Sequence, residues 1–395
     1  MTAIPILTKT QELDAFCKKA SECPYVTVDT EFLRERTYYS KLCLVQLAIP
    51  SSDDVAAVLV DPLSKDMDLA PLLELFQNEA VVKVFHSARQ DLEIFQVSYG
   101  VLPRPLFDTQ VAAMVCGFGE QVGYETLARQ VVKAKIDKSS RFTDWSKRPL
   151  SAAQQTYALA DVTHLRGIYE ELARQIETRD RGSWVEEEIA ALLEPSLYET
   201  DPTEAWKRVK TRNSSPRFLA LVAKLAEFRE RHAQSQNVPR SRVMKDDAVL
   251  ELAALKPRKL EDLSNSRMLQ RDQRKGVIGT GIIDAVNIAM DLSKEDCPTV
   301  VSADVNLQVN PALAELLRVL LRAASEASNV APRLIASAAD LNHLAAGKRD
   351  IPALQGWRAE VFGKQAEALC DGKIALAAKG ERVDIIDLEA LNYGK

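Results

Sequence analysis

Short apolar runs and helical periodicities alternate along the first part of the chain. Runs of β-branched and apolar residues predict strands, and apolar residues three or four positions apart predict helices. Strands are predicted at 25–28, 42–49, 55–60, 81–85 and 106–107. Helices are predicted at about 68–78, from near Ala88, and from Thr109 to Cys116. Three consecutive strands, followed by alternation of helix and strand, predict an α/β fold with a mixed sheet flanked by helices.

Ser151 marks a change to a helical pattern that continues along the rest of the chain. Ser151 and Gln154 form a capping-box signature, and the helix that follows is predicted to run to about Arg179. A polar, charged segment at 179–212 predicts a connection with some helix. The pattern therefore separates an α/β domain at 1–178 from the helical segments after it.

The C-terminal half contains an internal repeat. Asn237 and Asn329 occupy equivalent positions 92 residues apart. The matching pairs of segments are 215–220 with 310–314, 236–240 with 328–333, and 247–254 with 339–346. The repeat predicts two copies of one all-helical unit of roughly 80 residues, at 213–293 and 305–388.

The net charge of the chain conceals an uneven distribution. The 395 residues carry a formal charge of −5. The segment 203–291 contains 18 Lys and Arg residues against 11 Asp and Glu residues, a net charge of +7, so the remainder carries −12. This asymmetry predicts that one part of the protein binds an anionic partner, while another concentrates carboxylates.

Apolar stretches, cysteines and histidines exclude several classes of protein. No apolar stretch approaches the ~18–20 residues of a bilayer span, and the N-terminus lacks the basic run and apolar core of a secretory signal. The six cysteines form no CxxC pair, and the four histidines do not have the spacing of a zinc site. We therefore expect no membrane association, reduced thiols and a cytoplasmic location.

Asp29 and Glu31 form the first candidate metal-binding pair. Asp29 is predicted to lie at the end of the first strand, and strand residues two positions apart project to the same face. Their carboxylates repel each other unless a cation lies between them or water solvates both. A solvated strand end is the alternative interpretation.

Asp91, Tyr157 and Asp161 extend this candidate set. Asp91 falls in the first turns of a predicted helix, where an acid that merely compensates the helix dipole is the alternative, and Glu93 is a nearby substitute. Tyr157 and Asp161 are four residues apart, so they share one face of the long helix. A simple surface contact between the two side chains is the alternative interpretation. Two carboxylates on a strand and one on each of two helices are what a two-metal site needs, because hard divalent cations prefer oxygen ligands.

With these motifs the sequence resembles the DEDD-type 3′–5′ exonucleases of the tyrosine-containing branch, and among them the ribonuclease D family. The motifs are Asp29-Thr30-Glu31-Phe32, His86 to Phe95 with Asp91, and Tyr157-x-x-x-Asp161, and the family-like connecting segments are 36–47, 107–110 and 137–150. The two C-terminal repeats resemble HRDC domains. The resemblance covers nearly the whole chain.

The resemblance implies an RNase H-like fold and a set of site residues. The implied ligands of two divalent cations, Mg²⁺ or Mn²⁺, are Asp29, Glu31, Asp91 and Asp161. Tyr157 would position the nucleophilic water. One departure is that His86 and Ser87 occupy the region where proofreading exonucleases usually carry an Asn and an aromatic residue. This suits the ribonuclease D family but leaves the role of His86 open, and a histidine at a helix start with a satisfied hydrogen bond is the structural alternative.

Aromatic and basic residues near these motifs predict contacts to RNA, which proteins hold by phosphate charge and base stacking. Phe32 is a candidate to stack on the terminal nucleotide, with a buried strand residue as the alternative. The basic segment 131–148, which includes Lys138 and Arg141, predicts a loop near the cleft that meets phosphates. A merely solvated loop is the competing interpretation.

The first repeat carries a further basic cluster. Arg267, Arg271 and Arg274 recur at i, i+4 and i+7, which predicts three guanidiniums on one helix face, either binding phosphates or simply solvated. The second repeat is less basic and is expected to pack back against the α/β domain, forming a ring.

The sequence therefore predicts a metal-dependent 3′–5′ exoribonuclease that releases 5′-mononucleotides from structured RNAs. The expected substrates are tRNA precursors, at their 3′ ends. A DNA exonuclease of repair would use the same carboxylates and is one alternative. A catalytically inactive RNA-binding protein is another, although the complete set of acids argues against it. The modular layout requires no partner subunit, so we expect a monomer.

Overall fold

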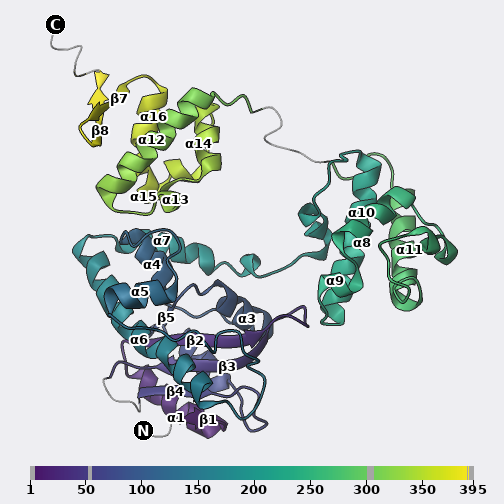
Figure 1. The fold of residues 1–395 in the computed structure, drawn as a ribbon, viewed down its shortest axis with the longest axis horizontal. Helices are drawn as coiled ribbons and strands as arrows, with labels where there is room; N and C mark the ends of the chain where they lie inside the picture. The colour runs from purple at the N-terminus through teal and green to yellow at the C-terminus, as the bar shows by residue number, and fades with distance from the viewer. Residues whose placement is uncertain (1–4, 52–55, 300–306, 389, 391–395) are drawn as a thin grey trace.

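Three lobes, each with its own apolar core, make up the protein (Figure 1). The computed structural model describes residues 5–51, 56–299, 307–388 and 390. We call the lobes the α/β lobe, with core residues up to Tyr198, the first helical lobe, from Ala205 to Cys297, and the second helical lobe, from Leu317 to Leu369. In the described part of the chain, none of the helices combines the length and the apolarity needed to cross a bilayer.

A six-stranded mixed sheet forms the centre of the α/β lobe, as predicted. The strand order is β1-β4-β3-β2-β5-β6. Strand β3 is antiparallel to both of its neighbours, whereas β1 is parallel to β4 and β5 is parallel to β2 and β6. The strands are β1 (Ile6–Leu7), β2 (Tyr25–Leu33), β3 (Lys41–Ala48), β4 (Ala57–Val60), β5 (Val82–Phe85) and β6 (Leu106–Asp108).

Helices flank this sheet, and the longest of them lies across β2, β3 and β4. The helices are α1 (Thr10–Ser21), α2 (Ala70–Gln77), α3 (Arg89–Tyr99), α4 (Thr109–Val115), α5 (Tyr124–Val131) and α6 (Ala152–Thr178). Ser151 and Gln154 form the predicted capping box at the start of α6. The capping box fixes the residue at which α6 begins. This start lies about one and a half turns before Tyr157 and about three turns before Asp161.

The placement of Asp29 at the end of a strand was wrong. Strand β2 continues through Leu33, because its pairing with β3 keeps the chain extended across the polar Asp29–Glu31 stretch. A bulge between Glu31 and Phe32 shifts the register there. Elements β1, α1 and α5 were not predicted, since β1 has only two residues and the two helices bury narrow apolar stripes among polar residues.

The connection to the helical lobes contains α7 (Gly182–Leu192) and the short helices η2 (Pro195–Leu197) and η3 (Pro202–Arg208). The first helical lobe then comprises α8 (Pro216–Ser235), α9 (Arg240–Val243), α10 (Asp246–Leu255), η4 (Leu260–Asn265) and α11 (Gly276–Asp291). The second comprises α12 (Pro311–Ser328), α13 (Pro332–Ile335), α14 (Ala338–Ala345), η5 (Pro352–Leu354), α15 (Gly356–Arg358), η6 (Ala359–Gly363), α16 (Lys364–Cys370), β7 (Ile374–Lys379) and β8 (Arg382–Asp387).

The order of elements in the two helical lobes repeats. Each begins with a long helix, continues through a short helix and a medium helix, and then forms a 3₁₀ turn. Asn237 and Asn329, which follow the long helices, both have left-handed backbone conformations, with φ of 48° and 53°. The prediction that the second repeat is all-helical was wrong, because β7 and β8 form an antiparallel hairpin at the end of this lobe.

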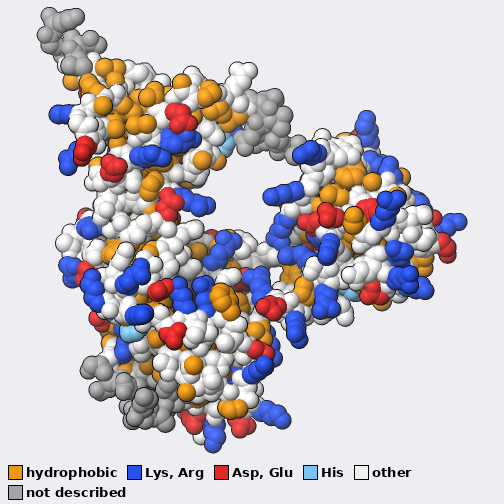
Figure 2. Space-filling model, viewed as in Figure 1, with side chains coloured by type: hydrophobic (Ala, Val, Ile, Leu, Met, Phe, Trp, Pro, Cys, Tyr) orange, Lys and Arg blue, Asp and Glu red, His pale blue; other side chains and the backbone are white. Residues whose placement is uncertain are grey.

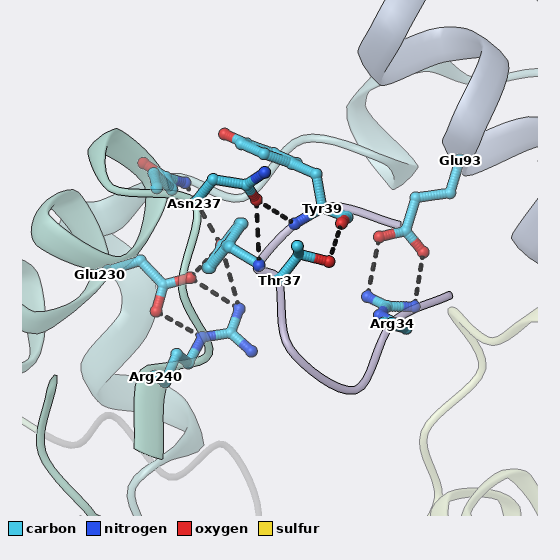
Figure 3. Close-up of polar contacts among 9 residues, drawn as sticks. Arg34, Thr37, Tyr39, Glu93, Glu230, Asn237 and Arg240 are labelled. Carbon is cyan, nitrogen blue, oxygen red and sulfur yellow. Dashed lines mark hydrogen bonds and ion pairs between the residues drawn. The ribbon is translucent and has the colours of Figure 1, made fainter. Parts of the chain in front are cut away.

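The first helical lobe contacts the loop 34–40, which joins β2 to β3 (Figure 3). The side-chain oxygen of Asn237 accepts hydrogen bonds from the backbone N–H groups of Tyr38 and Tyr39, at 3.1 and 3.0 Å. The Tyr38 hydroxyl donates to Glu230, whose ion pair with Arg240 measures 2.6 Å. The Arg240 guanidinium lies 5.0 Å from the centre of the Tyr38 ring.

The second helical lobe packs back on the α/β lobe, as expected from the sequence. Asn329 donates to the Cys116 carbonyl at 3.2 Å, so the equivalent asparagines of the two repeats both bond to the α/β lobe. Trp357 stacks on Trp184 of α7 with ring centres 4.7 Å apart. Arg358 forms ion pairs with two glutamates of α7.

Candidate active site

A pocket of about 550 Å³ opens between β2, α3, α5, α6 and the segment that joins α5 to α6. Its lining contains the five residues predicted from the sequence as a catalytic set: Asp29, Glu31, Asp91, Tyr157 and Asp161. Further residues that line the pocket include Gln90, Gln110, Tyr124, Ile136 and Leu165. The tertiary fold therefore gathers side chains that lie more than a hundred positions apart in the sequence.

Carboxylate oxygens converge in this pocket. One oxygen each from Asp29, Glu31 and Asp161 can be chosen so that all three atoms lie within 4.8 Å of one another. Asp91 is outside this trio but lines the same pocket, and its carboxylate accepts a hydrogen bond from the Thr30 hydroxyl. Strand β2 supplies two of the acids because its residues at i and i+2 face the same side.

Burial raises the pKa of all four carboxyl groups above their ordinary values. Repulsion from neighbouring carboxylates adds to the rise in pKa at Glu31, Asp91 and Asp161. The Arg141 guanidinium opposes that rise at Glu31 and Asp161. Buried and half-buried carboxylates in excess over nearby cations form a donor set that fits hard divalent metal ions.

Tyr157 lies one helical turn before Asp161 on α6. Burial raises the pKa of its hydroxyl, and the charge of Asp161 raises it further, so the group stays protonated at neutral pH. Its ring lies against Trp145, with ring centres 6.1 Å apart. Because Trp145 is buried, the tyrosine ring has a fixed wall on that side.

Arg148 holds the segment that carries Trp145, and its role was not predicted. It forms a two-bond ion pair with Asp61, at 2.6 and 2.8 Å. It also donates to the backbone carbonyls of Cys43 and Trp145, at 2.6 and 2.8 Å. The sequence placed Arg148 in the basic segment 131–148, which is predicted to meet phosphates, and placed both Trp145 and Arg148 in the family-like run 137–150. Neither signal identifies Asp61 or the backbone carbonyls as the partners of Arg148.

His86 also lines the pocket. Its Nδ1 lies 2.9 Å from the Thr109 hydroxyl, whereas Nε2 is buried and has no hydrogen-bond partner among the described atoms. Burial lowers the pKa of the imidazole. The interpretation as a structural histidine with a satisfied hydrogen bond therefore holds for one of its two nitrogens.

The structure places the predicted RNA-contacting residues in two different settings. Phe32, Lys138 and Arg141 line the pocket, and Lys138 forms an ion pair with Glu125. The prediction that the three arginines of the first helical lobe share a helix face was wrong. They lie between η4 and α11, in bends and turns.

Arg274 explains why no helix forms there. Its guanidinium donates to the backbone carbonyls of Ser266 and Leu269, at 2.7 and 3.0 Å, which folds the segment back on itself. The helix α11 begins only at Gly276, whose φ of 60° is left-handed. Arg267 and Arg271 are exposed on this turn-rich segment.

A mixed sheet with acids on a central strand and on two flanking helices, opening into one pocket, is the architecture of a 3′–5′ exonuclease. The family model described as 3′–5′ exonuclease matches residues 4–177, and the HRDC domain model matches residues 218–286. The α/β lobe is thus the RNase H-like exonuclease domain, and the first helical lobe contains an HRDC domain.

Comparison with whole proteins places the chain more narrowly. It is 57% identical to ribonuclease D of Jannaschia sp. (strain CCS1), over 97% of this chain and 99% of that one. It is 47% identical to ribonuclease D of Granulibacter bethesdensis, over 96% of each chain. The crystal structure of Escherichia coli RNase D, described as an exoribonuclease involved in structured RNA processing, superposes with a TM-score of 0.79. That match has 26% identity and covers 94% of this chain and 99% of that one.

The chain belongs to the ribonuclease D family. It is a 3′–5′ exoribonuclease, and the family resemblance seen in the sequence is confirmed. Membership implies RNA as substrate and the use of divalent metal, for which the cluster of acidic side chains is present. The catalytic core of RRP6 from Trypanosoma brucei shares the fold, at a TM-score of 0.56 and 22% identity over 73% of this chain.

Proposed function

We propose that Asp29, Glu31, Asp91 and Asp161 bind two divalent cations, magnesium or manganese. The observation that carries this proposal is the convergence of three carboxylate oxygens within 4.8 Å, in a buried setting that raises their pKa values. Bound there, such ions would stabilise negative charge on the oxygens of a phosphodiester under attack. The thiols and imidazoles of the chain lie outside this cluster, which supports hard rather than soft metals.

Tyr157 is the residue that orients the attacking water in this proposal. Its hydroxyl remains protonated, so it offers a hydrogen bond to an oxygen and accepts one from water. Packing against Trp145, which Arg148 secures, keeps the ring from turning away from Asp161. Water attack on the last phosphodiester then releases a nucleoside 5′-monophosphate and leaves a shortened RNA with a 3′-hydroxyl.

The proposed substrates are the 3′ ends of tRNA precursors and other structured RNAs, met in the cytoplasm by a monomeric enzyme. Phe32 would stack on the terminal nucleotide, and Lys138 and Arg141 would contact phosphates at the pocket. Arg267 and Arg271 would contact the body of the RNA from the first helical lobe, whose surface carries many Lys and Arg side chains (Figure 2). Arg274 is less suited to this role, because two backbone carbonyls already occupy its guanidinium.

We also propose the domain limits 1–178, 179–212, 213–293 and 305–388, with the last segment as a second HRDC domain. The repeated order of helices and the equivalent left-handed asparagines support this assignment. The hairpin β7–β8 would be an addition specific to the second copy.

A tRNA precursor labelled at its 5′ end tests the proposal directly. Wild-type protein should shorten it stepwise from the 3′ end with Mg²⁺ or Mn²⁺ and not with a chelator. Asp29→Asn and Asp161→Asn should leave it intact. Glu177→Gln, at an exposed position of α6, is the matched control and should digest like wild type. Metal-dependent digestion by either asparagine variant would refute the ligand assignment, and equal digestion of a matched DNA strand would refute the preference for RNA.

A further inference from the structure

Phe142 is the most exposed large apolar side chain in the described part of the protein. Its relative exposure is 90%, and the next highest is 72%, at Val277. Phe142 also lines the catalytic pocket, so the ring stands at its rim. An aromatic ring held in water forgoes the free energy that its burial would provide, and at the rim of a pocket it offers a flat apolar surface to a ligand.

The protein holds this ring on a fixed base. Thr143 donates twice to the Ser140 carbonyl, through its backbone N–H at 3.2 Å and its hydroxyl at 2.7 Å. Gln154, in the first turn of α6, donates to the Thr143 hydroxyl at 3.1 Å. Trp145 is fully buried three residues after Phe142. The exposed ring is therefore flanked by anchored residues on a tight turn.

Arg141 lies over one face of the Phe142 ring. Its guanidinium carbon lies 5.2 Å from the ring centre, which is a cation–π contact. The charge of the same guanidinium reaches Glu31 and Asp161 in the pocket. Since the relative exposure of Phe142 is 90%, the opposite face of the ring is open to a flat partner.

We propose that Phe142 is a stacking platform for the base of the penultimate nucleotide at an unpaired RNA 3′ end. This inference rests on the proposed function, in which the terminal nucleotide lies beside Phe32 and Glu31. The strand then leaves the pocket across its rim, where Phe142 stands. A base already paired in a stem is not available to stack on the ring. Digestion is therefore expected to slow when the penultimate nucleotide enters a duplex, which would set where trimming stops.

Short unstructured oligoribonucleotides labelled at the 5′ end test this stacking. One is intact, one lacks the base at the penultimate position, and one lacks it at the terminal position. The wild-type enzyme with Mg²⁺ should lose roughly 10-fold in kcat/KM when the penultimate base is absent, because one base stack is lost. Phe142→Ala should lose a similar factor on intact RNA and then be insensitive to the missing penultimate base. Phe142→Trp should behave like wild type, and Val277→Ala is the control for an exposed apolar residue elsewhere.

The results separate the stacking from the chemistry. Phe142→Ala digesting intact RNA at the wild-type rate would overturn the proposal, as would a penultimate-base penalty that persists in this variant. A penalty confined to the terminal base would overturn the assignment to the penultimate position. Wild-type protein that digests none of the oligonucleotides with either metal would refute the proposed function itself. Melting temperatures should match wild type in all three variants, because the substituted side chains are exposed.

Discussion

The acids of the pocket and the buried Glu230 of the first helical lobe have opposite electrostatic settings. In the catalytic pocket, burial raises the pKa of Asp29, Asp91 and Asp161 together, and the described residues offer them no ion-pair partner. In the first helical lobe, Glu230 is fully buried but forms an ion pair with Arg240 and accepts a hydrogen bond from Tyr38 (Figure 3). Burial by itself would raise the pKa of Glu230, but these partners outweigh it and the pKa lies below its ordinary value.

The difference distinguishes an acid that can hold the structure together from acids that we propose take part in the chemistry. A buried charge is costly unless a partner compensates it. Glu230 has that partner within the chain, so it can stabilise the contact between the first helical lobe and the loop 34–40. The pocket carboxylates have no ion pair among the described residues, and only Glu31 and Asp161 feel the charge of Arg141. In the proposed function, a bound cation supplies the remaining compensation. Acids with raised pKa values and no ion-pair partner are therefore a mark of a functional site.

Removing a pocket carboxylate should give the largest effect. Asp29→Asn or Asp161→Asn is expected to lower kcat/KM on RNA by on the order of 10³-fold, because charge stabilisation at the reacting phosphate is lost. The free energy of unfolding without metal should not fall, since the change removes an uncompensated charge. Digestion rates and denaturant unfolding measure the two quantities. A variant that loses activity and also unfolds far more easily would indicate a structural role instead.

Adding metal should stabilise the exonuclease domain and leave the ion pair of Glu230 with Arg240 unaffected. At a concentration 100 times its Kd, Mg²⁺ or Mn²⁺ is expected to stabilise the folded protein by about 2.7 kcal/mol. The melting temperature, measured with metal and with a chelator, reports this gain. Asp29→Asn should lose most of it. An equal gain in that variant would mean that the ion binds elsewhere in the protein.

Breaking the ion pair in the first helical lobe should cost stability rather than chemistry. Arg240→Met leaves Glu230 buried without its cation. We expect a loss of about 2 kcal/mol, less than for a fully buried pair because the Arg240 side chain is 39% exposed. Denaturant unfolding measures it, and adding Glu230→Gln should recover much of the loss. Arg258→Met breaks an exposed pair with Asp291 in the same lobe and is the control, with an expected loss under about 1 kcal/mol. Equal losses in both single variants would show that burial of Glu230 does not matter.

Lowering the pH should produce the smallest effect on the free energy of unfolding, and the pKa of Glu230 determines the sign of that effect. A carboxyl whose pKa is lower in the folded state than in the unfolded one stabilises the fold above its ordinary pKa. That contribution is lost as the pH falls through the lower, folded value. The stability difference between wild type and Glu230→Gln should therefore shrink on going from about pH 6 to about pH 3. Denaturant midpoints across this range check it, and a constant difference would contradict an ionised Glu230.

Much of the exonuclease domain could be predicted because its signals are local. The mixed sheet, the capping box at Ser151 and the pairing of Tyr157 with Asp161 depend on alternation or on spacings within one helical turn. The prediction that three arginines share a helix face also relied on a local spacing, and it failed. Spacings of four and three residues identify a helix face only where a helix forms. Here Arg274 bonds to backbone carbonyls and the chain turns instead.

The sequence by itself determined the chemical inventory of this protein: four acids, a tyrosine, a repeated helical unit and a basic segment, each carried by short-range pattern. Only the tertiary structure decided the electrostatic environment and the burial of these groups. Whether an acid is compensated depends on partners far along the chain, as with Tyr38 and Glu230, and whether an aromatic ring is buried or presented depends on how its loop is anchored, as with Phe142. Burial and charge compensation are properties of packing in three dimensions, so no spacing rule contains them.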